Sequence, residues 1–215
     1  TRPNTSLHRT ADVAVGNVVG TVLSQAAELS INEPPVIVLQ PLSRNVNPGA
    51  AATFTVGVSG TAPLRYQWRK DGVEIPGATA AQYAIATVQS AQEGAYDVVV
   101  ANVAGEVVSQ TVQLSLNSAV AITSQPVGAV LNPGASWSLG VSVSGTAPIN
   151  YQWRRNGVAL AAETAASLSI ASVQAADAGE YDVVVSNVVG SVVSQRVRID
   201  LNSALSVVRQ PAGLL

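Results

Sequence analysis

The sequence repeats itself at a constant offset of 85 residues, and this repeat limits the fold more than any other feature. The tetrapeptide YQWR occurs at 66–69 and again at 151–154. Residues 36–120 align with 121–205 without a gap, and about half of the aligned positions are identical. Internal repetition at a fixed period predicts tandem copies of one structural unit.

Partial copies of the repeat flank the two complete ones. Residues 11–31 align with 96–116, and residues 202–211 align with 117–126, whereas residues 1–10 do not match. Because the chain contains no methionine, we expect it to be a segment or a processed product. The predicted division is the tail of a preceding repeat, its last two strands, at 1–32, complete repeats at 33–118 and 119–203, and the first strand of a following repeat at 204–215.

Each repeat shows the pattern of many short strands. Around Val56 and Val58, apolar residues alternate with Thr, Gly and Ser, which is the period of a half-buried strand. Turn signals such as Asn47-Pro48-Gly49 and Asp71-Gly72 interrupt the chain at short intervals. Six or seven closely spaced strands in about 85 residues predict an all-β sandwich.

Composition excludes several classes of protein. The chain has 11 Lys and Arg against 13 Asp and Glu, so it lacks the basic surface of a nucleic-acid-binding protein. No stretch of about 18 residues is apolar throughout, which argues against a membrane span in this segment. The absence of cysteine excludes disulfides, thiolate nucleophiles and cysteine-ligated zinc.

Several motifs resemble the immunoglobulin superfamily, in particular its intermediate-set domains. Trp68 and Trp153, each within YQWR, stand where the family has a Trp on the third strand. Tyr96 and Tyr181 stand where the family has its corner tyrosine. The resemblance implies tandem immunoglobulin-like β-sandwiches with Greek-key topology. It also places this chain near the disulfide-free repeats of large bacterial surface or secreted proteins.

Valines occupy the positions at which that family has its two cysteines. The resemblance assigns these positions to Val56 and Val98 in the first repeat and to Val141 and Val183 in the second. Two valines beside an indole fill roughly the space of a cystine and contribute hydrophobic burial instead of a cross-link. The predicted structural core is Val56, Trp68, Tyr96, Val98, Val141, Trp153, Tyr181 and Val183.

Alternation also predicts how the second and fifth strands face each other. Tyr83 is expected opposite Ala52, and in the second repeat Leu168 is expected opposite Trp137. This exchange of a large and a small side chain keeps the core volume constant. We therefore expect Tyr83 and Trp137 to fill equivalent space.

The outward face of the third, sixth and seventh strands is the predicted interaction face. A solvated sheet face with Arg–Asp cross-strand pairs is the simpler interpretation, and a contact patch centred on an exposed valine of YDVVV is the more specific one. The candidate residues are Arg65, Gln67, Arg69, Asp97, Val99, Asn150, Gln152, Arg154, Asp182 and Val184.

No residue pattern predicts a catalytic, cofactor or metal site. His8 is the only histidine, and no residue pattern supplies the partners that it would need in a catalytic triad or a metal cluster. Asp177, Glu180 and Asp182 resemble a calcium cluster in type only, because alternation sends them to different faces. The sequon Asn4-Thr5-Ser6 is interpreted as a coincidence.

The linkers and the partial repeats predict how the chain is assembled. Only Asn117, Ser118 and Ala119 separate the two repeats, which predicts restricted bending and an extended rod. The partial repeat at 11–31 is expected to leave Val13, Val15, Leu29 and Ile31 uncovered. Either the segment comes from a longer array, or a neighbouring chain covers these strands; finding them ordered and solvated on both faces would argue against the second case.

These features favour a non-enzymatic function. The leading hypothesis is a structural and interaction segment of an extracellular or cell-surface repeat protein, such as a stalk, an adhesin or a self-assembling fibre or sheath unit. The expected partners are neighbouring copies or repeats of the same protein, other surface proteins or glycans. The alternative is an accessory carbohydrate-binding module of a large secreted polysaccharide-acting protein, although the aromatic residues are predicted to point inward.

Overall fold

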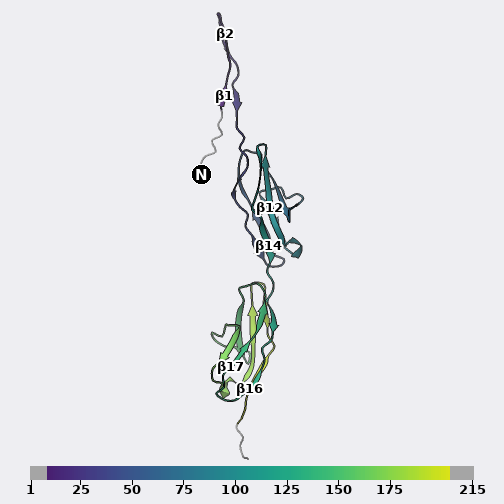
Figure 1. The fold of residues 1–215 in the computed structure, drawn as a ribbon, viewed down its shortest axis with the longest axis vertical. Coiled ribbons are helices and arrows are strands. Elements are labelled where there is room, and N and C mark those ends of the chain that lie inside the picture. Colours follow the sequence, from purple (N-terminus) through teal and green to yellow (C-terminus); the bar gives the residue numbers. More distant parts are fainter. Residues whose placement is uncertain (1–8, 204–215) are drawn as a thin grey trace, which may run out of the picture. The chain divides into compact units, whose positions relative to one another are not determined.

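A computed structural model describes residues 9–203 of the chain. Their regular structure is β-strand apart from two single-turn 3-10 helices, η1 (Ser90–Gln92) and η2 (Ala175–Asp177). The chain divides into two compact units, residues 1–116 and residues 117–215, and each contains one β-sandwich (Figure 1). The prediction of tandem all-β sandwiches is confirmed. The strand predicted within 204–215, His8 and the sequon at 4–6 lie outside the described residues.

The sandwich of repeat 1 has one large sheet and one small layer. The large sheet has the order β10-β9-β12-β14-β6, with β13 also paired to β12, and the small layer contains the pairs β5–β8 and β7–β11. Strand β6 runs parallel to β14, and β9 runs antiparallel to β12. The strands are β5 (Val36–Leu39), β6 (Arg44–Val46), β7 (Ala52–Thr55), β8 (Gly57–Ser59), β9 (Arg65–Lys70), β10 (Val73–Glu74), β11 (Gln82–Ile85), β12 (Gly94–Asn102), β13 (Gly105–Val108) and β14 (Val112–Leu116).

Repeat 2 has the same topology. Its large sheet has the order β16-β24-β22-β19-β20, with β23 paired to β22, and its small layer contains the pairs β15–β18 and β17–β21. The strands are β15 (Ala121–Ser124), β16 (Ala129–Leu131), β17 (Trp137–Gly140), β18 (Ser142–Ser144), β19 (Asn150–Arg155), β20 (Val158–Ala159), β21 (Ser167–Ile170), β22 (Gly179–Ser186), β23 (Ser191–Val193) and β24 (Val197–Leu201).

Residues 9–29 form a two-armed hairpin. It contains the strands β1 (Arg9–Ala11), β2 (Ala14–Asn17), β3 (Gly20–Leu23) and β4 (Ala27–Leu29), in which β1 pairs with β4 and β2 pairs with β3 (Figure 1). Arg9 pairs with Leu29, and Ala14 pairs with Leu23. Shifted by 85 residues, these are the pairs that β12 makes with β14 and with β13. The hairpin therefore has the strand pairing of the end of a repeat.

The turn after β9 is fixed by an acidic side chain. Asp71 has a left-handed backbone with φ of 51°, and its Oδ1 accepts a hydrogen bond from the Ala95 N–H at 2.9 Å. Gly94 passes close to this carboxylate with φ of 144°, and a Cβ there would lie 2.7 Å from Asp71 Oδ1. Asn156 occupies the same place in repeat 2 and accepts from the Glu180 N–H at 2.9 Å. Gly94 is thus required by a close approach.

The register between the small-layer strands differs from the prediction. Tyr83 lies opposite Phe54, and Ala52 lies opposite Ile85; in repeat 2, Leu168 lies opposite Leu139, and Trp137 opposite Ile170. The predicted pairs were wrong by two residues, because alternation determines which side chains point inward but not their partners. The Tyr83 and Trp137 rings nevertheless both lie beside the corner tyrosine of their repeat, with ring centroids 6.1 and 6.2 Å from Tyr96 and Tyr181.

Candidate interaction surface

Each sandwich is built around a fully buried indole. Trp68 and Trp153 have no exposed surface, and the indole Nε1 of each donates a hydrogen bond at 2.9 Å, to the carbonyl oxygens of Ala80 and Ala165 respectively. Burying an indole is favourable when its N–H finds an acceptor. On the neighbouring strand, Val98 lies opposite Trp68 and Val183 lies opposite Trp153.

Val56 and Val141, the other two valines at the cysteine positions of the family, lie in the same cores as Trp68 and Trp153. Val56 is buried in the core of repeat 1, and Val141 is half-buried against the core of repeat 2. Trp68 and Trp153 belong to these same core clusters. That the valines replace a cystine stays a prediction.

The corner tyrosines are buried and hydrogen-bonded. The Tyr96 hydroxyl donates to the Gln92 carbonyl oxygen at 2.7 Å, and the Tyr181 hydroxyl donates to the Asp177 carbonyl oxygen at 2.7 Å. Burial raises the pKa of Tyr96 to about 12, because the phenolate loses its hydration inside the core. Burial likewise raises the pKa of Tyr181. Each neutral hydroxyl therefore connects its own strand, β12 or β22, to the 3-10 helix before it.

The predicted interaction face is more covered than expected. Val99 and Val184 are half-buried, so they do not form the exposed valine patch that the sequence analysis considered. The Gln67 amide nitrogen donates to the Trp68 and Ile75 carbonyl oxygens at 2.9 and 2.8 Å, and Gln152 makes the equivalent bonds. These side-chain amides therefore donate to backbone carbonyl oxygens, which need donors when they are covered. Of the ten candidates, only Arg65 and Asn150 are largely exposed to solvent.

Charge pairs complete this face. In repeat 1, Arg69 donates to Asp97 through two nitrogens at 2.7 and 2.9 Å, and Arg154 makes the same bidentate pair with Asp182. The hydrogen bond to each carboxylate raises the pKa of Arg69 and Arg154. Asp182 is almost fully buried, contrary to the expectation of an outward, solvated side chain.

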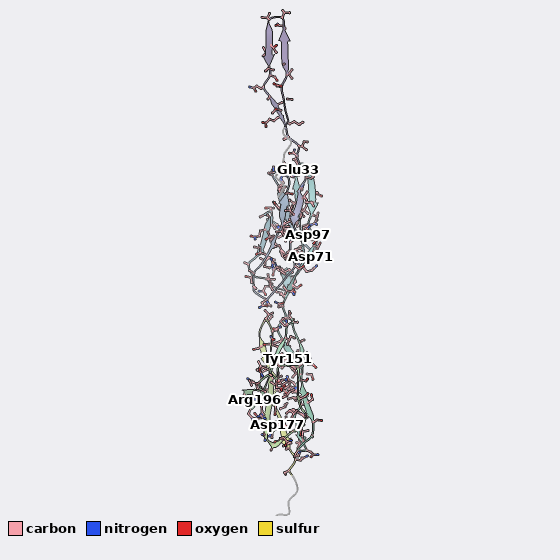
Figure 2. The ribbon with its side chains drawn as sticks, turned by 90° about the vertical axis from the view of Figure 1, so that its left-hand side faces the viewer. Glu33, Asp71, Asp97, Tyr151, Asp177 and Arg196 are labelled. Carbon is pink, nitrogen blue, oxygen red and sulfur yellow. The ribbon has the colours of Figure 1, made fainter. Side chains whose placement is uncertain are left out.

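An additional arginine explains the burial of Asp182. Arg196, which is labelled in Figure 2, belongs to repeat 2. Its guanidinium lies 3.5 Å from the Asp182 carboxylate and 3.7 Å from the Glu180 carboxylate. Threonine stands at the equivalent position 111 of repeat 1. The remaining acidic side chain of the considered calcium cluster, Asp177, accepts the Gln174 N–H at 2.8 Å. Within residues 9–203, no group of three or more His, Cys, Asp and Glu side chains is arranged to hold a metal ion.

The structure also reveals surface features that the sequence analysis did not select. Strand β5 and the residues after it expose four large apolar side chains, although the part of repeat 2 with the same topology has AITSQPV. The apolar residues of VIVLQPL at 36–42 do not alternate with polar ones, and this pattern could have indicated the exposed apolar side chains. The exposed residues are Val36, Val38, Leu39 and Leu42.

Repeat 2 has a cavity of about 400 Å³ beside the Tyr181 ring, lined among others by Arg155, Leu160 and Leu168. In repeat 1, the larger Tyr83 stands at the position of Leu168. This replacement of a tyrosine ring by the smaller leucine side chain could have indicated the cavity from the sequence.

The hairpin presents the residues that were predicted to be uncovered. Val13, Val15, Leu29 and Ile31 are each 59 to 67% exposed. The described strands are ordered, and both faces are open in this single chain. That a neighbouring chain covers these strands stays a prediction.

A family comparison now identifies the fold. The model of the immunoglobulin domain matches residues 34–102 and 121–187, one stretch in each sandwich. The chain belongs to the immunoglobulin domain family. The first match runs from the segment before β5 to the end of β12, and the second runs from the start of β15 to the residue after β22, so the hairpin lies outside both matches.

Proteins similar to this chain occur in humans and in a bacteriophage. Human Roundabout homolog 3 is 26% identical over 201 residues, covering 83% of this chain and 14% of that protein. Human hemicentin-1 is 30% identical over 175 residues, covering 75% of this chain and 3% of that protein. The decoration protein of Escherichia phage T5 is 40% identical over 70 residues, covering 31% of this chain and 43% of that protein. This chain thus spans a small part of the first two relatives.

Solved structures show the same tandem immunoglobulin fold. The I67–I69 fragment from the I-band of titin has a TM-score of 0.64 and 23% identity, covering 78% of this chain and 65% of that one. Extracellular domains 3–5 of Drosophila OTK have a TM-score of 0.50 and 20% identity, covering 85% of this chain and 69% of that one. Among residues 9–203, no helix is long and apolar enough to cross a membrane.

Proposed function

We propose that this chain is a non-enzymatic structural and interaction segment of an extracellular or cell-surface repeat protein. In this role its sandwiches set a fixed spacing and present side chains to neighbouring copies, other surface proteins or glycans, as a stalk, an adhesin or a fibre or sheath unit does. The observation that carries the proposal is how firmly the linker is bound to each repeat.

The linker is held on its repeat-2 side by hydrogen bonds between Ser118 and the residues Thr146 and Asn187. The Ser118 N–H donates to Thr146 Oγ1 at 2.8 Å, and the Thr146 N–H donates to the Ser118 carbonyl at 3.2 Å. Asn187 adds bonds from its amide nitrogen to the carbonyls of Ser118 and Thr146 at 2.8 and 3.0 Å. Repeat 1 holds its own preceding linker in the same way, through Glu33, Thr61 and Asn102.

The linker is also held on its repeat-1 side. The Leu116 N–H donates to the Glu93 carboxylate at 2.8 Å. Between this anchor and the anchor at Ser118 lies only Asn117. Flexible linkers need several unrestrained Gly or Ser residues. One residue between two anchors supports a fixed spacing of the repeats.

Location and assembly form the finer part of the proposal. The fold occurs in the extracellular domains of OTK, which supports a place outside the cell. The similarity of 70 residues to the phage decoration protein supports a surface or sheath role, and also the bacterial setting that the sequence resemblance implies.

The test measures the spacing with spin labels. Because the chain lacks cysteine, Val73→Cys and Val158→Cys place single labels at equivalent positions that are each 70% exposed. Pulsed electron paramagnetic resonance should give a narrow distance distribution. Inserting Gly-Ser-Gly-Ser between Asn117 and Ser118 should broaden it severalfold, because the anchors are then separated by a flexible segment.

A label pair within repeat 1, Val73→Cys with Val103→Cys, is the matched control and should not respond to the insertion. If the unaltered linker already gives a distribution as broad as the insertion variant does, the spacing role is contradicted.

A further inference from the structure

The hairpin matches the buried end of a repeat residue by residue. Val13 corresponds to Val98 and Val183, and Leu29 corresponds to Leu114 and Ile199. The residues of the complete repeats are at most 1% exposed, whereas Val13 and Leu29 are 61 and 63% exposed. In repeat 1, Val98 belongs to one core cluster with Phe54, Val56, Trp68 and Ile85. A set of apolar side chains like these, called the cover below, would fit the exposed face of the hairpin.

The backbone bridge of the repeats is also formed in the hairpin. The Val13 N–H donates to Ser24 Oγ at 2.9 Å, as Val98 does to Ser109 Oγ at 3.0 Å. Asn17 Oδ1 accepts from the Val19 and Gly20 N–H groups, which is the arrangement of the asparagine at the same position of repeat 2. The hairpin is therefore preformed.

Two polar positions define what the cover must offer. Asp12 corresponds to Asp97 and Asp182, each of which is met by an arginine of the neighbouring strand. Asn17 corresponds to Asn187, whose amide nitrogen donates to carbonyls of the linker and of the loop before β19. A matching cover thus carries an arginine for Asp12 and two backbone carbonyls for Asn17.

We infer that the hairpin face docks against an immunoglobulin-like sandwich that lacks its own last two strands. This cover corresponds to residues 33–93 of repeat 1, with an indole beside Val13 and an arginine facing Asp12. The inference stands apart from the spacing role, because it rests on residues 9–31 alone.

The hairpin departs from the repeats where the corner is formed. Ala11 replaces the corner tyrosine, and Arg9 stands at the position of Gly94. A Cβ at Gly94 would collide with the Asp71 carboxylate. A cover with a smaller residue at the position of Asp71 therefore fits best, and the completed sandwich is less stable than repeats 1 and 2.

The test completes the sandwich in the full chain. A copy of residues 33–93 replaces residues 1–8 and is joined to Arg9, with Arg9→Gly and Ala11→Tyr included in a second version so that the corner is restored. Hydrogen exchange of peptides spanning β2 and β3 should slow more than tenfold in the second version, because their amides enter a closed core. The first version should show the same protection with a lower midpoint of thermal unfolding.

Two single substitutions provide the matched control. Val13→Asp should abolish the protection, whereas Val18→Asp should not, because the equivalents of Val18 are exposed in the complete repeats. Unchanged exchange in both extended versions overturns the inference. A dimer of the original chain that Val13→Asp converts to a monomer in sedimentation also overturns it, because a second copy would then be the cover.

Discussion

At the residue scale, each sandwich centre combines apolar side chains with fully satisfied polar atoms. Trp68 and Trp153 bury their rings while their N–H groups find carbonyls, and no buried side-chain nitrogen or oxygen among residues 9–203 lacks a partner. Burying one valine contributes about 1.5–3 kcal/mol, whereas a disulfide typically contributes about 2–4 kcal/mol. A valine pair is thus comparable to the cross-link that the chain lacks.

The corner tyrosine predicts how repeat 1 responds to alkali. The pKa of Tyr96 rises from 10.0 to about 12 on folding, so the folded state holds this proton more tightly than the unfolded state. The contribution of Tyr96 to the free energy of unfolding is therefore complete below pH 10 and is lost as the pH rises toward 12. Urea unfolding of repeat 1 between pH 8 and pH 12, followed by circular dichroism, measures this loss.

Tyr96→Phe is the control for the alkaline response. It should lower the free energy of unfolding near pH 8 by about 1 kcal/mol, because the hydrogen bond to the Gln92 carbonyl is lost. It should also flatten the pH dependence above pH 10. An unchanged alkaline slope in this variant would show that the corner tyrosine is not responsible.

At the scale of elements, a serine in each repeat connects the long strand, β12 or β22, to the segment that follows β13 or β23. Ser109 Oγ accepts the Val98 N–H at 3.0 Å and donates to the Gln110 carbonyl at 3.0 Å. Ser109→Ala should lower the free energy of unfolding of repeat 1 by about 1–3 kcal/mol, because a buried N–H loses its acceptor. Urea denaturation measures the change.

The hairpin offers a matched comparison for this serine. Ser24 makes the same two bonds at an exposed site. Ser24→Ala should leave the unfolding of both repeats within about 0.5 kcal/mol of the unaltered chain, because water replaces the hydroxyl there. Equal losses in both variants would mean that burial of the bridge does not matter.

The strands and the inward side chains were predictable from the sequence, whereas registers and coverage were not. Alternation placed Tyr83 on the inner side, yet its partner is Phe54 because register depends on how the connecting loops close. The burial of Asp182 escaped prediction because it depends on Arg154 in β19 and on Arg196 in the segment before β24, which lie far apart in the sequence. Pattern within one strand contains no information about such contacts.

At the scale of the whole molecule, the two sandwiches have the same kind of core around a buried tryptophan. The linker anchors at Ser118 and Glu33 recur with the same 85-residue offset as the cores, so each repeat has the same core and binds the segment before it in the same way. In arrays of this kind, the stability of the chain is close to the sum of its repeats and their interfaces. A change at one centre should therefore act on its own repeat first.

The most direct measurement restores the cross-link that the valines are inferred to replace. Val56→Cys with Val98→Cys, and separately Val141→Cys with Val183→Cys, should oxidise in the folded chain without thiol reagents, since the two positions should meet the geometry of a disulfide. Mass spectrometry should find each pair closed, and the midpoint of thermal unfolding should rise for the altered repeat. Thiols that remain free in folded, oxidised protein would contradict the claim that these valines occupy the place of a cystine.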